Sequence, residues 1–464
     1  MTAARLVILG ASGDLTGRYL LRALAELTAA GQLPGDLDIV GVARDDWDDA
    51  SFRRHAAERL ARHGAEVPGA VRHDVVSRLR YVRGDAGDAG TLRAAAAGAG
   101  GPVLVYLALP PFVFAPAIAG LAAAGLGHDT RIVVEKPFGT DLASARDLNA
   151  LLHRHFPEEA VFRMDHFLGK QTVQNVLGLR FANRLFEPLW RAEHVESVDI
   201  VWDETVALEG RAGYYDRTGA LRDMIQNHLL QLLTFVAMER PAGLGERPLR
   251  DAKARVLRAV GALDEAAVRA RTVRGRYSAG GIGGRPVPDY AAEAGVDPAR
   301  GTETFAEVVL FVDDDRWRGV PFRLRTGKAL GRDRREVRIG FRAVERLPFG
   351  QPDGPGPNVL TLAMDPDRLW VDIALNGAGD PFCLDPARID LDLAPQELSA
   401  YARLLVDALE GDPALATRGD EAEESWRIVE PIVDAWAGGV VPLHAYPAGS
   451  SGPLAEPVAR TTRV

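Results

Sequence analysis

The chain has 464 residues, of which 47% are hydrophobic and 26% charged, so it is a globular protein too long for one hydrophobic core. Its formal net charge of -9 argues against a nucleic-acid-binding protein, whose contact surface would be basic. The single cysteine, Cys383, excludes a disulfide framework and a cysteine-rich metal site within one chain, and we expect a cytoplasmic protein without a metal.

The first predicted element is a short apolar strand, Leu6–Leu9, which a glycine loop joins to a helix that includes Arg18 to Leu24. Glycines let the backbone approach a pyrophosphate, and the start of a helix presents free N–H groups to an anion. The loop has the spacing Gly-x-x-Gly-x-x-x-Gly between Gly10 and Gly17, which is not the usual dinucleotide spacing. The order strand, loop, helix nevertheless predicts a dinucleotide site; a tight turn without a ligand is the alternative.

The second predicted strand runs from Asp38 to Ala43 and ends at Arg44, where an NAD-binding domain typically has an acidic residue. A guanidinium at this position suits the 2′-phosphate of NADP, because it can pair with phosphate through two hydrogen bonds. Asp45 and Asp46 follow directly, and their charge opposes a further negative group. We therefore predict NADP as the preferred cofactor, with NAD possible; an exposed surface arginine is the alternative.

Further strands at Val103–Leu107 and Arg131–Val134 each follow an alanine-rich helical stretch, so β and α elements alternate over about the first 150 residues. This alternation predicts a doubly wound, Rossmann-type parallel sheet. Ligands of such sheets bind beyond the carboxyl ends of the strands. The residues that fall there include Ala108, Leu109, Pro110 and Lys136.

The segment Arg163–Lys170 carries an acid, an imidazole and an ammonium group within six positions: Asp165, His166 and Lys170. It could therefore supply a carboxylate that orients a base, a ring that moves a proton, and a cation for an anionic substrate. If the segment opens a helix, His166 and Lys170 share one face. The alternative is an ordinary solvated first turn with a chance charge pair.

A helix from about Ala220 to Ala237 has a broad apolar stripe that Asp223, Asn227 and His228 interrupt. Burying these polar groups without partners costs ~1–3 kcal/mol each, so they need internal hydrogen bonds or a ligand. For His228 the alternative is a core histidine with satisfied hydrogen bonds.

From about Thr304 onward several strands follow one another without helices, which predicts a mainly antiparallel sheet. A closing helix is expected at Leu398–Leu409, and the Pro/Gly-rich regions 241–303 and 342–358 are expected to be loops. The fold class is thus α/β plus α+β, with a dinucleotide-binding domain at 1–165 and a larger substrate-binding and dimerisation domain at 166–464.

Several blocks of the sequence, taken in order, resemble the glucose-6-phosphate dehydrogenase family from residue 5 to about residue 450. They are Gly10–Leu15, Tyr106–Pro111, Glu135–Gly139, Asp165–Lys170, Arg222–Gln231 and Arg325–Leu330. The resemblance implies an oxidoreductase of the pentose phosphate pathway, which transfers hydride from C1 of glucose 6-phosphate to NADP. It also implies a homodimer or a dimer-based homotetramer that associates through its antiparallel sheet.

By this resemblance His228 matches the base that takes the C1 hydroxyl proton, and Asp165 matches the carboxylate that holds the imidazole. The substrate-binding positions are Lys136, His166, Lys170, Glu204, Asp223 and Lys328, of which His166 and Lys170 match phosphate ligands and Lys136 also touches the cofactor. The cofactor positions are Gly10, Ser12, Gly13, Asp14, Leu15, Arg44, Ala108, Leu109, Pro110 and Lys136.

Three residues depart from the family pattern, of which Asp365 stands where some members have a glutamine. Phe167 stands where the family usually has a tyrosine whose hydroxyl helps to hold the phosphate, and Asp333 stands where a basic residue is frequent, although Arg332 and Arg334 are near. These changes leave open a paralogue that oxidises a different aldose or aldose phosphate with the same Asp-His dyad. A catalytically silent cofactor-binding regulator is the third reading. No membrane span is expected, because the uncharged stretch Ala94–Gly127 is interrupted by prolines.

Overall fold

The computed structural model describes residues 2–127, 129–210, 212–347, 356–379 and 383–453. The chain forms two compact units. The first contains Met1–Lys170, Pro241–Asp251 and Gln396–Glu423, and the second contains Gln171–Arg240, Ala252–Pro395 and Glu424–Val464. Our predicted domains, 1–165 and 166–464, are consecutive in the chain, so they place Pro241–Asp251 and Gln396–Glu423 in the second domain, whereas these segments belong to the first compact unit.

The first unit is built on a six-stranded parallel sheet with the strand order β3-β2-β1-β4-β5-β6. The strands are β1 (Arg5–Leu9), β2 (Asp38–Ala43), β3 (Leu79–Arg83), β4 (Val103–Leu107), β5 (Thr130–Glu135) and β6 (Val161–Met164). The predicted doubly wound sheet is confirmed. Its strand order reverses between β1 and β4, the point at which such sheets open a crevice for a ligand.

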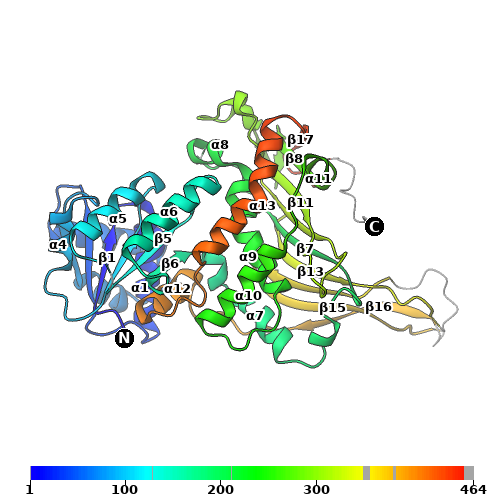
Figure 1. Ribbon diagram of the computed structural model, residues 1–464, viewed down its shortest axis with the longest axis horizontal. Helices are drawn as coiled ribbons and strands as arrows, with labels where there is room; N and C mark the ends of the chain where they lie inside the picture. Colours follow the sequence, from blue (N-terminus) through cyan, green and yellow to red (C-terminus); the bar gives the residue numbers. More distant parts are fainter. Residues whose placement is uncertain (1, 128, 211, 348–355, 380–382, 454–464) are drawn as a thin grey trace. The chain divides into compact units, whose positions relative to one another are not determined.

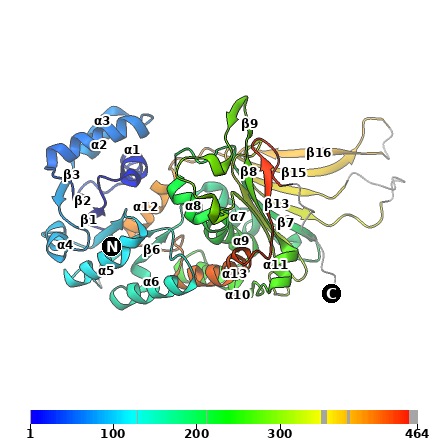
Figure 2. The ribbon, with the colours of Figure 1, turned by 90° about the horizontal axis from the view of Figure 1, so that it is seen from above.

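Helices cover both faces of this sheet (Figures 1 and 2). Leu6 and Ile8 of β1 pack into one core, and Val7 and Leu9 pack into the other. Because both of their faces are buried, the central strands β1 (after Arg5) and β4 are apolar at every position instead of at every second one. The first core includes helices α1 (Leu21–Ala29), α2 (Asp49–His63), α3 (Gly69–Ser77) and α12 (Ala400–Glu410), and the second includes α4 (Ala89–Ala96), α5 (Phe114–Ala123) and α6 (Leu142–His155).

The second unit contains a nine-stranded sheet with the order β16-β15-β14-β13-β7-β12-β11-β8-β17 (Figure 1). Only the β7–β12 and β8–β17 pairs are parallel among the strands of this described sheet, so the predicted mainly antiparallel sheet is confirmed. The strands are β7 (Val195–Asp203), β8 (Thr272–Ser278), β11 (Phe305–Leu310), β12 (Phe322–Gly327), β13 (Arg334–Phe341), β14 (Val359–Met364), β15 (Asp367–Asn376), β16 (Leu384–Leu391) and β17 (Leu443–Pro447).

The helices of the second unit include one with unusual hydrogen bonding. The predicted helix from Ala220 to Ala237 is present, but its first part, η6 (Leu221–Leu229), is a π-helix that continues into α9 (Leu230–Ala237). A π-helix has i→i+5 hydrogen bonds, is rare, and occurs frequently at functional sites. The other helices of this unit are α7 (Gln171–Phe181), α8 (Ala212–Ala220) and α11 (Glu265–Arg271), while α10 (Glu246–Ala259) and α13 (Gly419–Ala437) contain residues of both units.

The expectation that region 241–303 is a loop is wrong. It contains α10, α11 and β8, together with a small hairpin of β9 (Gly280–Ile282) and β10 (Arg285–Val287). Its prolines and glycines gather at the ends of these elements, while the helices between them are charged but bury an apolar side that includes Leu249, Leu257 and Val268. In region 342–358, residues 342–347 and 356–358 form neither helix nor strand, and 348–355 lie outside the described residues. Among the described residues no helix combines the length and the hydropathy needed to cross a bilayer.

Candidate functional site

A cavity of about 700 Å³ lies at the carboxyl ends of β1, β2 and β4 in the first unit. It occupies the position at which the strand order reverses, as expected for a dinucleotide crevice. Most of the predicted cofactor residues line it: Gly10, Ser12, Gly13, Arg44, Ala108, Leu109 and Pro110. Asp14, Leu15 and Lys136 are not among its lining residues.

Gly10 allows the loop after β1 to lie close to the end of β4. Its φ of +86° is unfavourable for residues with a side chain, and a Cβ there would lie 2.3 Å from the Ala108 carbonyl oxygen. The Gly13 amide donates to the Gly10 carbonyl at 3.0 Å, after which the chain turns into the π-helix η1 (Thr16–Leu20) and then α1. The start of a helix therefore faces the crevice region, where its free amides can bind an anion.

Asp14 and Leu15 hold this loop in place. The Asp14 carboxylate accepts hydrogen bonds from Arg18 at 2.9 Å and from Arg59 at 2.5 Å. Partial burial alone would raise the pKa of Asp14, but the hydrogen bonds and charges of Arg59 and Arg18 outweigh it and lower this pKa. Leu15 packs against the core beneath α1. Their side chains thus support the loop, and the role of Asp14 and Leu15 toward a cofactor stays a prediction.

Arg44 lines the crevice with an exposed guanidinium group that has no hydrogen bond or ion pair within the described residues. Asp46, whose charge we expected to oppose an added phosphate, forms an ion pair with Arg83 at 2.6 Å. Asp45 lines the same cavity. Arg44 is thus a cation without an ion pair in a crevice that the carboxyl-bearing residues Asp45 and Asp85 also line.

A buried acid lies at the end of β5, next to Lys136, which is half-buried. The Glu135 carboxylate accepts a short hydrogen bond from the Tyr106 hydroxyl of β4. Burial, which outweighs the Tyr106 hydrogen bond and the Lys136 charge, raises the pKa of Glu135 to about 7, and the charge of Asp165 contributes to this rise. Glu135, Lys136 and Asp165 are therefore electrostatically coupled. We did not predict this Tyr106–Glu135 pair, for which the only signal is an acid at the end of an apolar strand.

We expect Glu135 to make stability depend on pH. Above about pH 4.5 the unfolded carboxyl loses its proton while the folded one keeps it up to about pH 7, so the free energy of unfolding falls over this range. Between about pH 4.5 and about pH 7, the free energy of unfolding of the unmodified protein should fall by about 3 kcal/mol relative to that of Glu135→Gln. Urea unfolding across this pH range measures the difference. The control is Glu58→Gln, which changes an exposed acid. If the difference in stability between the unmodified protein and Glu135→Gln stays constant with pH, Glu135 does not have a raised pKa.

Asp165 lies at the end of β6 with 1% of its surface exposed. It caps a short 3₁₀ helix, η4 (His166–Gly169), and its Oδ1 accepts from the Phe167 amide at 3.0 Å. Lys170 follows in extended conformation, and α7 begins at the next residue. His166 and Lys170 therefore do not share one face of an α-helix, because the 3₁₀ helix ends before Lys170.

The His166 ring lies among aromatic side chains of the first unit. It stacks on Tyr401 of α12 with 5.6 Å between centroids, and meets the edge of Phe167 at 5.1 Å. Tyr401 in turn stacks on Tyr19 at 4.8 Å. Phe167 is 3% exposed, so the residue that departs from the family pattern serves as packing for the imidazole. Sequence reasoning missed Tyr401, because nothing local links α12 to this segment.

In the second unit a cavity of about 140 Å³ brings together Glu204, Asp223 and Lys328. Parallel pairing of β7 with β12 sets Asp203 opposite Gly327, so that the residues following them, Glu204 and Lys328, leave the same edge of the sheet. The Lys328 ammonium lies 2.8 Å from a Glu204 carboxylate oxygen. These three residues are the ones for which the resemblance implies contact with sugar hydroxyls.

The same cavity contains an aromatic residue that we did not predict. Tyr215 is buried, and the Lys328 ammonium lies 5.2 Å from its ring centroid. Burial, together with the charges of Asp223, Glu303 and Glu204, raises the pKa of Tyr215 well above its ordinary value. It therefore stays a neutral hydroxyl that can donate a hydrogen bond. It lies in α8, and its residue type alone does not indicate a place in the cavity.

His228 and Asp223 both belong to the π-helix η6. In an α-helix, residues five apart point in directions about 140° apart, whereas i→i+5 bonding brings them near one face. His228 is 1% exposed, and its backbone amide lies 2.6 Å from Oδ1 of Asn227. The predicted burial of polar groups in this helix is confirmed for both Asn227 and His228.

Asp333 supports the loop that carries Glu204. Its Oδ1 accepts hydrogen bonds from the Thr205 amide at 2.7 Å and from the Thr205 hydroxyl at 3.1 Å. Arg334, one of the two arginines near this position, forms an ion pair with Asp203 at 2.9 Å. The acid at position 333 thus has a structural partner within the second unit.

The chain is similar over nearly its whole length to known proteins. The families described as "Glucose-6-phosphate dehydrogenase, NAD binding domain" and "Glucose-6-phosphate dehydrogenase, C-terminal domain" match residues 7–175 and 177–461. The glucose-6-phosphate 1-dehydrogenase of Gluconobacter oxydans is 42% identical, covering 96% of this chain and 94% of that protein.

Two solved structures are also similar. The glucose-6-phosphate 1-dehydrogenase of Mycobacterium avium is 38% identical with a TM-score of 0.85, and covers 97% of this chain and 96% of its own. A glucose-6-phosphate dehydrogenase in complex with its substrate glucose-6-phosphate is 32% identical with a TM-score of 0.89, covering 97% and 95%.

Proposed function

Because the chain belongs to the glucose-6-phosphate dehydrogenase family, we propose that it oxidises glucose 6-phosphate at C1 to the 1,5-lactone and passes the hydride to NADP. The observation that carries this proposal is the small cavity where two carboxylates, an ammonium and a neutral tyrosine converge, as a polyhydroxylated ring requires. A bound nicotinamide dinucleotide supplies the hydride acceptor, and the crevice of the first unit has the glycine approach and helix start that suit its pyrophosphate.

The residues of the second unit bind the sugar. Glu204 and Asp223 accept hydrogen bonds from hydroxyl groups, and Lys328 donates to a ring substituent while its charge is balanced by Glu204. These polar groups are held by β7, η6 and the end of β12, so little reorganisation is needed when the sugar arrives.

His166 and Lys170 bind the phosphate group, and Lys136 contacts both sugar and cofactor. Stacking on Tyr401 fixes the plane of the His166 ring, so its N–H can point at a phosphate oxygen without loss of rotational freedom. Phe167 offers no hydroxyl for this phosphate, so the ring N–H of His166 and the charge-assisted hydrogen bonds of Lys170 carry the recognition.

Proton transfer is assigned to His228, which takes the proton of the C1 hydroxyl as the hydride leaves C1. The sugar thereby loses two electrons and two protons in total, one proton with the hydride and one to the imidazole, and becomes the lactone. Asp165 acts as the positioning carboxylate for this imidazole and stabilises the imidazolium that forms. The two residues belong to different compact units, so their joint action is tested functionally below.

A substrate panel tests the reaction directly. We expect kcat/KM for glucose 6-phosphate to exceed that for free glucose and for other hexose phosphates, because His166 and Lys170 bind a phosphate and the sugar cavity orients the hydroxyls. Rates of coenzyme reduction by the purified protein give these values at one fixed pH. A tenfold or greater preference for another aldose or aldose phosphate would overturn the proposal and favour a paralogous substrate.

Arg44 is proposed to select NADP by binding its 2′-phosphate. Arg44→Ala should lower the ratio of kcat/KM with NADP to kcat/KM with NAD by about 10-fold to 100-fold, since a charge-assisted hydrogen bond contributes about 1.5–3 kcal/mol. Arg54→Ala is the matched control, because Arg54 is an exposed arginine of the same unit that does not line the crevice. An unchanged ratio in Arg44→Ala would remove Arg44 from the cofactor site.

We further propose that the protein is a cytoplasmic homodimer or homotetramer that associates through the sheet of the second unit. Leu375, Ile389 and Leu391 of β15 and β16 are exposed apolar side chains, which supports burial of this edge against another copy. Analytical ultracentrifugation gives the oligomeric state, and a monomer at micromolar concentration would contradict this assignment.

A further inference from the structure

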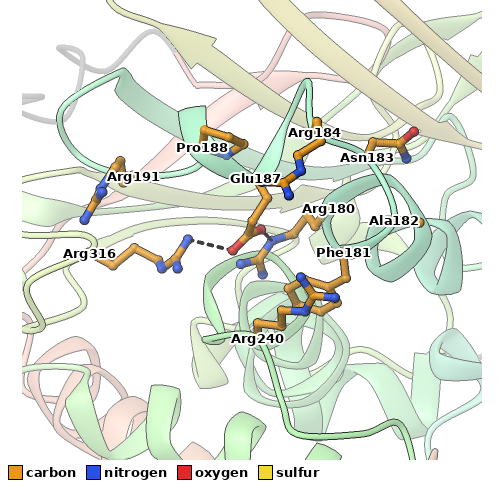
Figure 3. Close-up of a pocket in the computed structure, with 10 residues that line it drawn as sticks. All are labelled: Arg180, Phe181, Ala182, Asn183, Arg184, Glu187, Pro188, Arg191, Arg240 and Arg316. Carbon is orange, nitrogen blue, oxygen red and sulfur yellow. Dashed lines mark hydrogen bonds and ion pairs between the residues drawn. The ribbon is translucent and has the colours of Figure 1, made fainter.

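The second unit contains a further cavity, of about 480 Å³, whose lining is rich in arginine (Figure 3). Its charged lining residues are Arg180, Arg184, Arg191, Arg240, Arg316 and Glu187. None of its lining residues belongs to the dinucleotide crevice or to the sugar cavity. The proposed reaction therefore gives this cavity no role.

Arg180, near the end of α7, has a buried guanidinium group that is incompletely paired. Its Nη1 donates to the carbonyls of Phe235 and Val236 at 3.1 and 2.9 Å, and its Nε lies 3.4 Å from Oε2 of Glu187. Its Nη2 is buried without a hydrogen-bond partner within the described residues, although the side chain is 0% exposed. Because this atom is inaccessible, an anion in the cavity would interact with the charge of the buried guanidinium group, which water screens little, and not through a hydrogen bond to Nη2.

The carboxylates near the cavity are already engaged. Arg316 donates from Nη1 to Glu187 at 3.1 Å, as Figure 3 shows, and from Nε and Nη2 to both carboxylate oxygens of Glu239 at 2.7 Å. Burial lowers the pKa of Arg180 to about 10; Glu187 opposes this shift and the nearby charge of Arg316 adds to it. The positive charges of Arg180 and Arg316 therefore repel each other at this cavity.

Arg184, Arg191 and Arg240 are exposed and form no ion pair with an acid within the part of the chain that the structure describes, although the charge of Arg191 helps to lower the pKa of Glu239. They come from three different segments: the turn after α7, the approach to β7, and the turn after α9. Figure 3 shows their side chains on different sides of the Arg180–Glu187 pair. An arrangement of this kind surrounds a compact anion, whereas nucleic-acid binding needs a basic surface that extends along a backbone.

We propose that this cavity binds a small anion with two or more phosphate groups. Guanidinium groups match phosphate oxygens with two parallel hydrogen bonds, so arginines from separate elements can each bind one edge of such a ligand. The volume is within the range of small-molecule sites. The group that the cavity recognises is a diphosphate, either as a free ion or as part of a nucleotide. Binding would tie the end of α7 to the segments that follow α9 and precede β7.

Isothermal titration of the full-length protein with inorganic pyrophosphate tests this site. We expect saturable binding that the double variant Arg184→Ser/Arg240→Ser weakens at least tenfold, with kcat at saturating substrates unchanged. The matched control is Arg269→Ser/Arg318→Ser, which removes the same charge from exposed arginines of the second unit and should bind as the unmodified protein does. Inorganic orthophosphate should bind at least tenfold more weakly than pyrophosphate.

Each contrary outcome is decisive. If Arg184→Ser/Arg240→Ser binds pyrophosphate as tightly as the unmodified protein, the ligand occupies the dinucleotide or substrate site and the proposal is wrong. If both double variants bind pyrophosphate equally weakly, the loss of affinity comes from the change in net charge and not from this cavity. No saturable binding by the unmodified protein, or equal affinity for orthophosphate, would also overturn it. None of these results depends on the identity of the sugar substrate.

Discussion

His228→Asn is expected to lower kcat by about 10³-fold to 10⁴-fold with a much smaller change in KM, because it removes the group that takes the C1 hydroxyl proton. The substitution keeps a polar side chain in the buried position on η6, where an apolar one would disturb the surrounding hydrogen bonds. Initial rates of coenzyme reduction over a range of glucose 6-phosphate concentrations separate kcat from KM.

The control is His444→Asn, which replaces a half-buried histidine of β17 in the same unit that lines none of the cavities described above. It should retain the kcat of the unmodified protein. If His228→Asn also retains a kcat within tenfold of the original, His228 is not the base and another group must take the proton.

Asp165→Asn should lower kcat by about 10²-fold to 10³-fold, again with little effect on KM. An asparagine oxygen can still accept the Phe167 amide at the start of η4, so the turn should persist while the negative charge is lost. The loss acts on the transition state, because the imidazolium develops its charge only as the proton moves. Thermal unfolding of the variant verifies that the first unit remains folded.

A double-mutant cycle tests whether the two residues act together. If Asp165 works by orienting and stabilising His228, then Asp165→Asn/His228→Asn should be no slower than His228→Asn alone, because the carboxylate has nothing left to assist. Independent roles would instead multiply the two rate losses, and that result would reject the dyad. The cycle reports joint action without reference to the arrangement of the two units.

The local order of the chain was sufficient to predict four strands of the first sheet, β1, β2, β4 and β5, whereas β3 and β6 were missed. Leu6–Leu9, the glycine loop and the following helix are contiguous, so their pattern specifies a strand that is buried on both faces and a crevice at its end. The antiparallel strands β11 to β15 were likewise predictable, because each has apolar side chains over its own length. β16 and β17 were missed, since β16 is largely exposed and β17 is short.

Features that depend on distant contacts were not predictable. The helix Leu398–Leu409 was expected, but its place beside η4, where Tyr401 stacks on His166, depends on the chain returning to the first unit. The π-helical bonding of η6 has no signature in residue type. Asp14 was assigned to the cofactor by resemblance, yet its carboxylate is held by Arg18 and Arg59, whose positions follow only from the folded loop.

The site itself was partly predictable. Motif residues at strand ends were expected to meet a ligand, and the structure gathers most of the predicted cofactor residues in one crevice and Glu204, Asp223 and Lys328 in one cavity. Tyr215 and the Tyr106–Glu135 pair were missed, because a buried hydroxyl near carboxylates is a property of packing and cannot be read from spacing.

Hydride transfer from C1 is the central claim, and an isotope label follows it directly. The purified protein should be given NADP and glucose 6-phosphate carrying deuterium at C1, and the reduced coenzyme analysed by mass spectrometry and NMR. We predict that the deuterium appears at C4 of the nicotinamide ring. Coenzyme reduction without any transfer of the label, or no reduction with this substrate, would contradict the account.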